Sequence, residues 1–239
     1  MSEGAATSQG RALEGRAILV TGAHGGLGRA VALACTQAGA TAILLGRKSR
    51  RLEQVADAIE KAGGDALLYP LDLEGAVPDD YADLAARLGE RPGRLDGVVH
   101  CAAEFAGLTP LEHTDPAAFA RALHVDLTAR WWLSQACLPL LRASDAATLV
   151  FAIDPAPCAA PAYWGGYGIA QHGLEALVAM LDAETASTPL RVRALRPGPM
   201  RTPLRARAYA AEDDRLARDP ARFAAECIEL LAAPPASVR

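Results

Sequence analysis

Short apolar runs alternate with amphipathic segments along almost the whole chain. The first apolar run, RAILV at 16–20, leads into a glycine-rich loop and then into apolar residues that recur at helical spacing between Ala30 and Ala38. This pattern predicts a buried strand followed by an amphipathic helix. Further apolar runs predict strands at 41–45, 66–69, 97–101, 148–153 and 190–195. Strands that alternate with helices are typical of a parallel sheet with right-handed crossovers, so we predict an α/β fold with a doubly wound parallel sheet.

Capping and breaking residues delimit the helices. Helical spacing predicts helices at 49–62, 78–88, 116–141, 166–184 and 220–231. Gly63 and Gly64 end the first of these, and Asp115 followed by Pro116 is a typical start for the longest. Pro139 lies late in the longest helix and is expected to bend it.

Composition and charge exclude several classes of protein. The 239 residues are 51% hydrophobic, with no repeat or linker, so we expect a single domain over 1–239 with residues 1–12 as a flexible tail. The net charge of −4 gives no sign of nucleic-acid binding. No apolar run approaches the roughly 20 residues needed to span a membrane. The five cysteines form no CxxC pair, which argues against zinc and disulfides and favours a cytoplasmic location.

The glycine loop TGAHGGLG at 21–28 is the most informative motif. Gly22 permits a tight turn, Gly26 lets backbone amides approach a pyrophosphate, and Gly28 lets the helix pack closely on the strand. The helix N-terminus supplies unpaired N–H groups for phosphates. Because the loop lies between a predicted strand and a predicted helix, it predicts a dinucleotide site; a glycine-rich loop without a ligand is the alternative.

Further motifs follow the glycine loop in order. Asp72-Leu73 end the third predicted strand, HCAA at 100–103 follows the fourth, Tyr167 lies on the helix after the fifth, and Pro197-Gly198 precede Thr202. With the glycine loop, these residues resemble the short-chain dehydrogenase/reductase family from Arg16 to about Leu231. The resemblance implies a Rossmann fold and oxidoreductase activity. The residues that it places around the dinucleotide are Gly22, His24, Gly26, Leu27, Gly28, Asp72, Leu73, Ala102, Pro197, Gly198 and Thr202.

The end of the second predicted strand indicates which dinucleotide binds. A carboxylate there usually holds the ribose 2′-hydroxyl of NAD, whereas a 2′-phosphate requires a cation. This chain has Arg47 and Lys48 there and no acid before Glu53. Arg47 offers a forked donor to phosphate, and His24 adds a further donor. We therefore predict NADP(H); a solvated, basic helix start is the alternative.

Three positions of the family's Asn-Ser-Tyr-Lys tetrad differ in this chain. The resemblance places Asp126 at the asparagine position, Asp154 at the serine position and Gln171, four residues after Tyr167, at the lysine position. Gln171 supplies no charge, and Asp154 near Tyr167 penalises a tyrosinate, whose ordinary pKa is about 10. Tyr167 is therefore expected to be a poor base for alcohol oxidation, while its protonated form remains able to donate in carbonyl reduction.

Other polar and aromatic residues are secondary candidates. His100, Cys158 and Tyr163 are expected to face the same cleft as Asp154, with Cys158 lacking an activating base. His172 is interpreted as structural or exposed. No cluster of His, Cys and carboxylates has metal-ligand spacing. The candidate pocket residues for a modest apolar substrate are Phe105, Tyr163, Trp164 and Met200.

The end of the chain departs from the family pattern. The family usually adds a seventh strand, but here the last predicted helix is followed by a short tail containing Pro234 and Pro235. We therefore expect six strands. We also expect a homodimer or higher oligomer that associates through the long helix and the Tyr167 helix, because Trp131 and Trp132 suit a buried interface.

Two functional hypotheses of different class follow. The first is an NADP(H)-dependent oxidoreductase of the short-chain type that acts on a small-molecule carbonyl or alcohol, with activity weakened by the altered tetrad. The second is a catalytically inactive dinucleotide-binding protein that acts as a sensor or as the partner of a related subunit. A non-redox lyase or isomerase that uses Asp154 is a more distant third reading.

Overall fold

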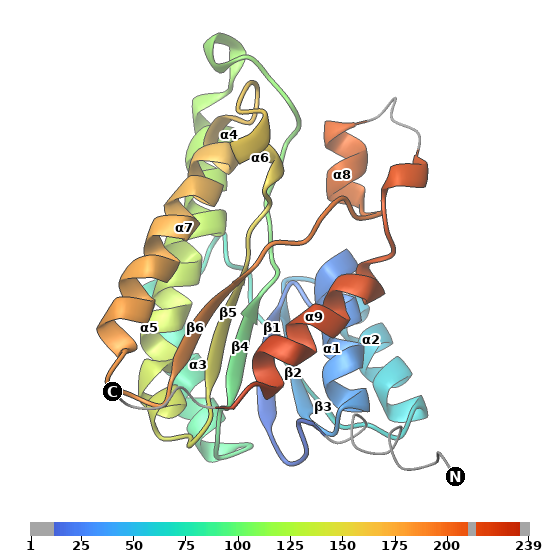
Figure 1. Ribbon diagram of the computed structural model, residues 1–239, viewed down its shortest axis with the longest axis vertical. Coiled ribbons are helices and arrows are strands. Elements are labelled where there is room, and N and C mark those ends of the chain that lie inside the picture. The colour runs from blue at the N-terminus through green and yellow to red at the C-terminus, as the bar shows by residue number, and fades with distance from the viewer. Residues whose placement is uncertain (1–11, 210–213, 235–239) are drawn as a thin grey trace.

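A six-stranded parallel sheet forms the centre of the molecule (Figure 1). The computed structural model describes residues 12–209 and 214–234. The strand order is β3-β2-β1-β4-β5-β6, and each neighbouring pair is parallel. The strands are β1 (Ala17–Thr21), β2 (Thr41–Gly46), β3 (Ala66–Pro70), β4 (Gly97–His100), β5 (Thr148–Ala152) and β6 (Arg191–Leu195). The predicted fold class is confirmed.

Helices cover both faces of the sheet (Figure 1). One face carries α1 (Gly26–Gln37), α2 (Ser49–Lys61) and α9 (Pro220–Ala232). The other carries α3 (Pro78–Glu90), α5 (Ala129–Arg142) and α7 (Gly165–Thr185). The strands are therefore apolar on both sides: Leu19 packs into the α3–α5–α7 side of the core, and Ile18 and Val20 pack into the opposite side. This double burial explains why the strands have continuous apolar sequences.

The long helix after β4 is interrupted. Asp115 caps α4 (Pro116–Leu123) as predicted, since its carboxylate accepts from the N–H groups of Ala117 and Ala118. A five-residue π-helical segment, His124–Thr128, then separates α4 from α5. The predicted helix over 116–141 is therefore present but contains a wider turn, and Asp126 lies in it. Such π-helical insertions are frequent at functional sites.

Two short helices after β5 and β6 lie outside the predicted elements. They are α6 (Ala156–Ala159) and α8 (Pro203–Ala208), and both are too short to show helical periodicity in the sequence. After α9, the described residues 233–234 carry no strand, while 235–239 and most of the expected tail at 1–12 lie outside the described residues. None of the helices in the described part of the chain is long and apolar enough to cross a membrane.

The glycine loop joins β1 to α1 through close backbone contacts. Gly22 has a φ of +62°, and a Cβ there would lie 2.8 Å from Cα of Ala102, just after β4. A Cβ on Gly28 would collide with the carbonyl group of Gly22, 2.8 Å from its carbon. The hydroxyl of Thr21 accepts from the N–H groups of Cys101 and Ala102, each at 3.0 Å. These contacts fix the loop against the end of β4.

The substitution Gly28→Ala is expected to lower the free energy of unfolding by about 1–3 kcal/mol, although alanine is the better helix former. The added methyl group meets backbone atoms, which move only if α1 shifts relative to β1. Chemical denaturation measures the loss. Gly75→Ala is the matched control, because a Cβ at Gly75 has no neighbour within 4 Å. Equal stability of the two variants would contradict the close-packing argument.

Candidate functional site

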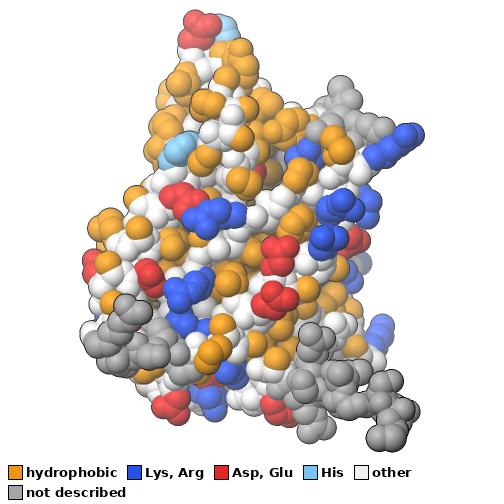
Figure 2. All heavy atoms as spheres, in the orientation of Figure 1, with side chains coloured by type: hydrophobic (Ala, Val, Ile, Leu, Met, Phe, Trp, Pro, Cys, Tyr) orange, Lys and Arg blue, Asp and Glu red, His pale blue; other side chains and the backbone are white. Residues whose placement is uncertain are grey.

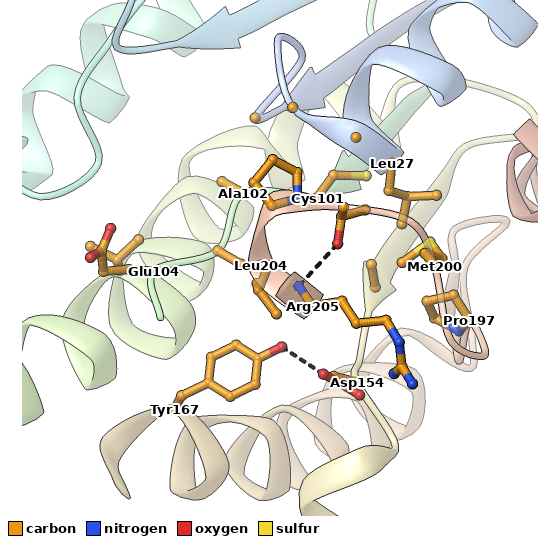
Figure 3. Close-up of a pocket in the computed structure, with 18 of the residues that line it drawn as sticks. Leu27, Cys101, Ala102, Glu104, Asp154, Tyr167, Pro197, Met200, Leu204 and Arg205 are labelled. Atoms are coloured by element: carbon orange, nitrogen blue, oxygen red, sulfur yellow. Dashed lines mark hydrogen bonds between the residues drawn. The ribbon is translucent and has the colours of Figure 1, made fainter. Parts of the chain in front are cut away.

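A cavity of about 620 Å³ opens at the carboxyl ends of the strands (Figure 3). Its walls come from the β1–α1 loop, the ends of β2, β4 and β5, the start of α7, and the segment from Pro197 to Tyr209 that includes α8. In an open parallel sheet with this strand order, ligands bind at the carboxyl edge where the order reverses, which is the position of this cavity between β1 and β4.

The residues expected to hold a dinucleotide converge on this cavity. Gly25 precedes α1, and no described side chain caps this helix, so its first N–H groups are left for a ligand where Gly26 and Leu27 line the wall. This uncapped terminus fits a pyrophosphate. The predicted residues that line the cavity are Gly22, His24, Gly26, Leu27, Arg47, Asp72, Leu73, Ala102, Pro197, Gly198 and Thr202. Gly28 lies behind the wall and packs on Gly22.

Positive charge gathers where β2 ends. Arg47, Lys48 and Arg51 line this end of the cavity beside His24. Burial lowers the pKa of His24, and the charges of Arg51, Lys48 and Arg47 lower it further. Arg47 lies 3.7 Å from a carboxylate oxygen of Glu74 and 4.0 Å from one of Glu104, with its side chain 45% exposed. Ion pairs this long and this exposed are weak, and a phosphate dianion competes well for the guanidinium.

The opposite end of the cavity holds Tyr167, Asp154 and Gln171. The hydroxyl of Tyr167 donates to Oδ2 of Asp154 at 3.1 Å, as Figure 3 shows. Oδ1 of Asp154 accepts from the N–H of Ala156 at 2.9 Å, and the N–H of Asp154 donates to Oε1 of Gln171 at 2.9 Å. Gln171 lies one helical turn after Tyr167 on α7, and both face the end of β5. The three residues thus form one connected group.

The environment of Tyr167 opposes its ionisation. The side chain is only 4% exposed and packs against Phe105 and Trp164. Burial raises the pKa of Tyr167 well above its ordinary value, and the carboxylates of Asp154 and Asp126 raise it further. At neutral pH the phenol therefore keeps its proton. Tyr167 is therefore in the protonated form that a proton donor needs, and the phenolate that a base needs is scarcely populated.

Asp126 is buried behind the cavity wall rather than in it. Its Oδ1 accepts from the N–H of Glu104 at 2.9 Å, while its Oδ2 has no hydrogen-bond partner among the described residues. Burial raises the pKa of Asp126 to about 7, against the opposing effects of Arg130 and the Glu104 N–H bond. Asp126 is therefore not part of the cavity lining and contacts the loop that contains Glu104, which lines the cavity.

Arg130 is a site residue that sequence reasoning missed. Its side chain is 2% exposed, yet the residue contributes to the cavity wall. Nη1 donates to the carbonyl of Ala152 at 3.0 Å, Nη2 donates to the carbonyl of Ala102, and Nη2 lies 3.7 Å from Oδ1 of Asp126. The available signal was the Asp126–Arg130 spacing of four residues on one helix. That spacing is equally common on solvated faces.

The structure corrects three expectations about the cleft. His100 is fully buried, stacks on Phe151 and pairs its Nε2 with the hydroxyl of Ser134 at 2.9 Å, so it does not face the cavity. Cys158, on α6, and Tyr163, between α6 and α7, are exposed and lie outside the cavity lining.

Two of the predicted substrate-pocket residues, Trp164 and Met200, line the cavity, but Phe105 supports Tyr167 from behind. His172 bonds the carbonyl of Gly168 on its own helix, as a structural residue does. Among the described residues, no group of His, Cys and carboxylates is placed to hold a metal ion.

The segment after β6 closes the cavity and brings positive charge to it. Leu204, Arg205, Arg207 and Tyr209 line the cavity from α8 and its end. The guanidinium of Arg205 lies 4.4 Å from the ring centre of Tyr209. Figure 2 shows Lys and Arg side chains gathered around α8 and the start of α9.

Comparison with known proteins identifies the family. The model of the short chain dehydrogenase family matches residues 16–213. The uncharacterized oxidoreductase YciK of Escherichia coli K12 is 37% identical over 210 residues, which cover 87% of this chain and 83% of YciK. The chain therefore belongs to the short-chain dehydrogenase family.

Two solved structures are similar over nearly their whole length. A short chain dehydrogenase of Shigella flexneri complexed with NADP has a TM-score of 0.89 and 34% identity, covering 93% of each chain. One of Escherichia coli CFT073 complexed with NADPH has a TM-score of 0.88 and 36% identity, covering 92% of this chain and 91% of that one.

The buried carboxyl of Asp126 is expected to make stability depend on pH. Its pKa of about 7 in the folded protein exceeds the unfolded value of about 3.9, so its contribution is complete below the unfolded value and is lost as the pH rises through 7. From about pH 5 to about pH 8, the free energy of unfolding should fall by about 2–3 kcal/mol relative to Asp126→Asn. Urea titration at several pH values measures this difference.

The control for loss of a carboxylate is Asp57→Asn, at an exposed position on α2. Its stability should follow the wild-type pH dependence. If wild type and Asp126→Asn change in parallel between these pH values, Asp126 does not titrate as argued.

Proposed function

We propose that this protein is an NADP(H)-dependent oxidoreductase that reduces a small carbonyl compound, with Tyr167 as the proton donor. The observation that carries the proposal is the buried hydroxyl of Tyr167, held by Asp154 at the end of a cavity whose other end is an uncapped helix terminus. The N-terminus of α1 would hold the pyrophosphate of a dinucleotide in the same cavity that Tyr167 lines. Family membership supports the same assignment.

The residues present suit NADP(H) in particular. The N-terminus of α1 takes the pyrophosphate, and Arg47 with His24 takes the 2′-phosphate at the end of β2. Asp72 and Leu73 flank the adenine, while Pro197, Gly198 and Thr202 cover the nicotinamide end. Similarity to family members complexed with NADP and NADPH supports this choice.

The chemistry divides between the cofactor and the chain. When bound, NADPH supplies a hydride to the carbonyl carbon. Tyr167 gives its proton to the carbonyl oxygen and retains the electron pair of its O–H bond. Gln171 holds the backbone of Asp154, and Asp154 orients the phenol. Because burial and Asp154 raise the pKa of Tyr167, the phenol holds at neutral pH the proton that carbonyl reduction requires, whereas alcohol oxidation would need the scarcely populated phenolate as its base.

A second candidate function is that of a silent partner subunit that binds the cofactor without turnover. The observation that favours it is the bond from the Tyr167 hydroxyl to Asp154, which engages the proton that a substrate would receive. Apolar side chains on the outer faces of α5 and α7 suit association with a second copy or a related subunit: Trp131 is 43% exposed, Ile169 50% and Met180 59%.

NADPH is expected to bind more tightly than NADH, and Arg47→Ala should weaken NADPH binding by about ten- to a hundredfold while changing NADH binding little. The reason is the loss of charge-assisted hydrogen bonds to the 2′-phosphate. Titration calorimetry with both cofactors measures the affinities. Arg50→Ala is the matched control, since Arg50 is exposed on the same helix start and does not line the cavity. Equal affinity for the two cofactors would refute the role of Arg47.

Alcohol oxidation with NADP⁺ is expected to be very weak at neutral pH, because Tyr167 lacks a lysine one turn away and faces Asp154. The combined change Asp126→Asn, Asp154→Ser and Gln171→Lys should raise oxidation far more than any single change, since groups that act as a unit are not additive. Rates on a panel of generic alcohols and carbonyls measure the effect. Robust wild-type turnover that the triple change abolishes would instead show that the site works through Asp154 and Tyr167.

A further inference from the structure

The charged side chain of Arg130 is buried, and the burial of a charge carries a large desolvation penalty. Its guanidinium lies between the ends of β4 and β5, where the carbonyls of Ala102 and Ala152 accept from it. Nε has no hydrogen-bond partner among the described residues, and the nearest carboxylate oxygen, on Asp126, is 3.7 Å away. A buried ion pair with incomplete hydrogen bonding is a poor way to stabilise a fold, since apolar residues of similar size serve as well or better. The position therefore calls for a functional explanation.

The charges around Tyr167 supply a functional explanation for Arg130. Charged groups from separate elements lie around Tyr167: Asp154 follows β5, Asp126 lies in the π-helical segment, and Arg130 is the second residue of α5. Arg130 lines the same cavity as Tyr167, and its Nη1 donates to the carbonyl of Ala152, two residues before Asp154. Arg205 and Arg207 line this cavity from α8. The two carboxylates and burial raise the pKa of Tyr167, and Arg130 lowers it. When Tyr167 gives up its proton, the electron pair left on its oxygen faces Asp154. Arg130 is the charge in this group that stabilises that state.

We infer that Arg130 is a positioning residue for Tyr167 and supplies from α5 a buried positive charge in the cavity wall, which Gln171 does not provide on α7. This inference rests on the proposed function. Arg130 transfers no proton: the O–H bond of Tyr167 breaks, an O–H bond forms on the carbonyl oxygen, and solvent later returns a proton to the phenolate. Asp126, one helical turn before Arg130, orients the guanidinium and is itself held by the N–H of Glu104.

The competing explanation is that Arg130 only ties the ends of β4 and β5 together through the carbonyls of Ala102 and Ala152. The two roles respond differently to substitution. Arg130→Lys keeps the charge but loses the forked donor, so it preserves an electrostatic role and weakens a tie. Arg130→Met fills similar space without charge or donor, and Arg130→Gln keeps a donor without charge.

The first measurement is carbonyl reduction at saturating NADPH. We expect Arg130→Met and Arg130→Gln to lower kcat by about a hundredfold, and Arg130→Lys to recover most of it, to within about tenfold of wild type. The Kd for NADPH should stay within about threefold in all variants, which separates an effect on proton transfer from an effect on binding. In the oxidative direction, the pH at which activity begins should move upward by about one unit or more in Arg130→Met.

The second measurement needs neither substrate nor cofactor. Tyrosine is replaced biosynthetically by a more acidic fluorinated tyrosine, and ¹⁹F NMR follows the ionisation of position 167, assigned through Tyr167→Phe. The resonance should titrate about one unit or more higher in Arg130→Met and Arg130→Gln than in wild type, with Arg130→Lys close to wild type. Circular dichroism checks that each variant is folded. If Arg130→Met does not fold, Arg130→Gln is the neutral variant that is compared with wild type and Arg130→Lys.

Each outcome has a definite meaning. If Arg130→Lys is as impaired as Arg130→Met, or if the neutral variants titrate at the wild-type pH, Arg130 is a structural tie and the inference is wrong. If wild type neither binds NADPH nor reduces any carbonyl, the proposed function fails, while the ¹⁹F titration still decides whether Arg130 stabilises the ionised Tyr167.

Discussion

The close approach of backbone at the carboxyl ends of β1 and β4 is the constraint on which the site depends. Gly22 lies against Ala102, and Gly28 lies against the carbonyl of Gly22, so neither position has room for a side chain. The hydroxyl of Thr21 accepts two further hydrogen bonds, from the N–H groups of Cys101 and Ala102 after β4. This contact holds the N-terminus of α1 at the edge of the sheet. It also fixes Ala102, whose carbonyl anchors Arg130.

The same edge of the sheet concentrates charge at one end of the cavity. Asp154 and Tyr167 share a hydrogen bond, and the Asp126–Arg130 pair lies buried behind them. Sites that contain charges in a low-dielectric environment have strongly shifted pKa values, and such shifts cluster where proteins do chemistry. Here the balance keeps the phenol of Tyr167 protonated.

Much of the fold was accessible from the sequence because its signals are local. The predicted strands and helices differ from β1–β6, α2, α3, α7 and α9 by only a few residues at their ends. The cap at Asp115 and the spacing of Tyr167 and Gln171 on one helix were predictable for the same reason. Two features of the site could not be predicted from local signals. Arg130 looks like an ordinary charged helix residue, and the π-helical turn at Asp126 leaves the apolar periodicity around it unchanged.

The sequence by itself therefore determined the order of elements, the glycine loop, the basic end of β2 and the spacing of Tyr167 and Gln171 on one helix. These properties depend on neighbours within a turn or a strand. Only the tertiary structure decided which groups meet: that Asp154 accepts from Tyr167, that His100 is buried away from the cavity, and that Arg130 reaches one carbonyl at the end of β5 and another just after β4. Such contacts join residues far apart in the chain, and their geometry and burial arise only when the sheet and helices pack together.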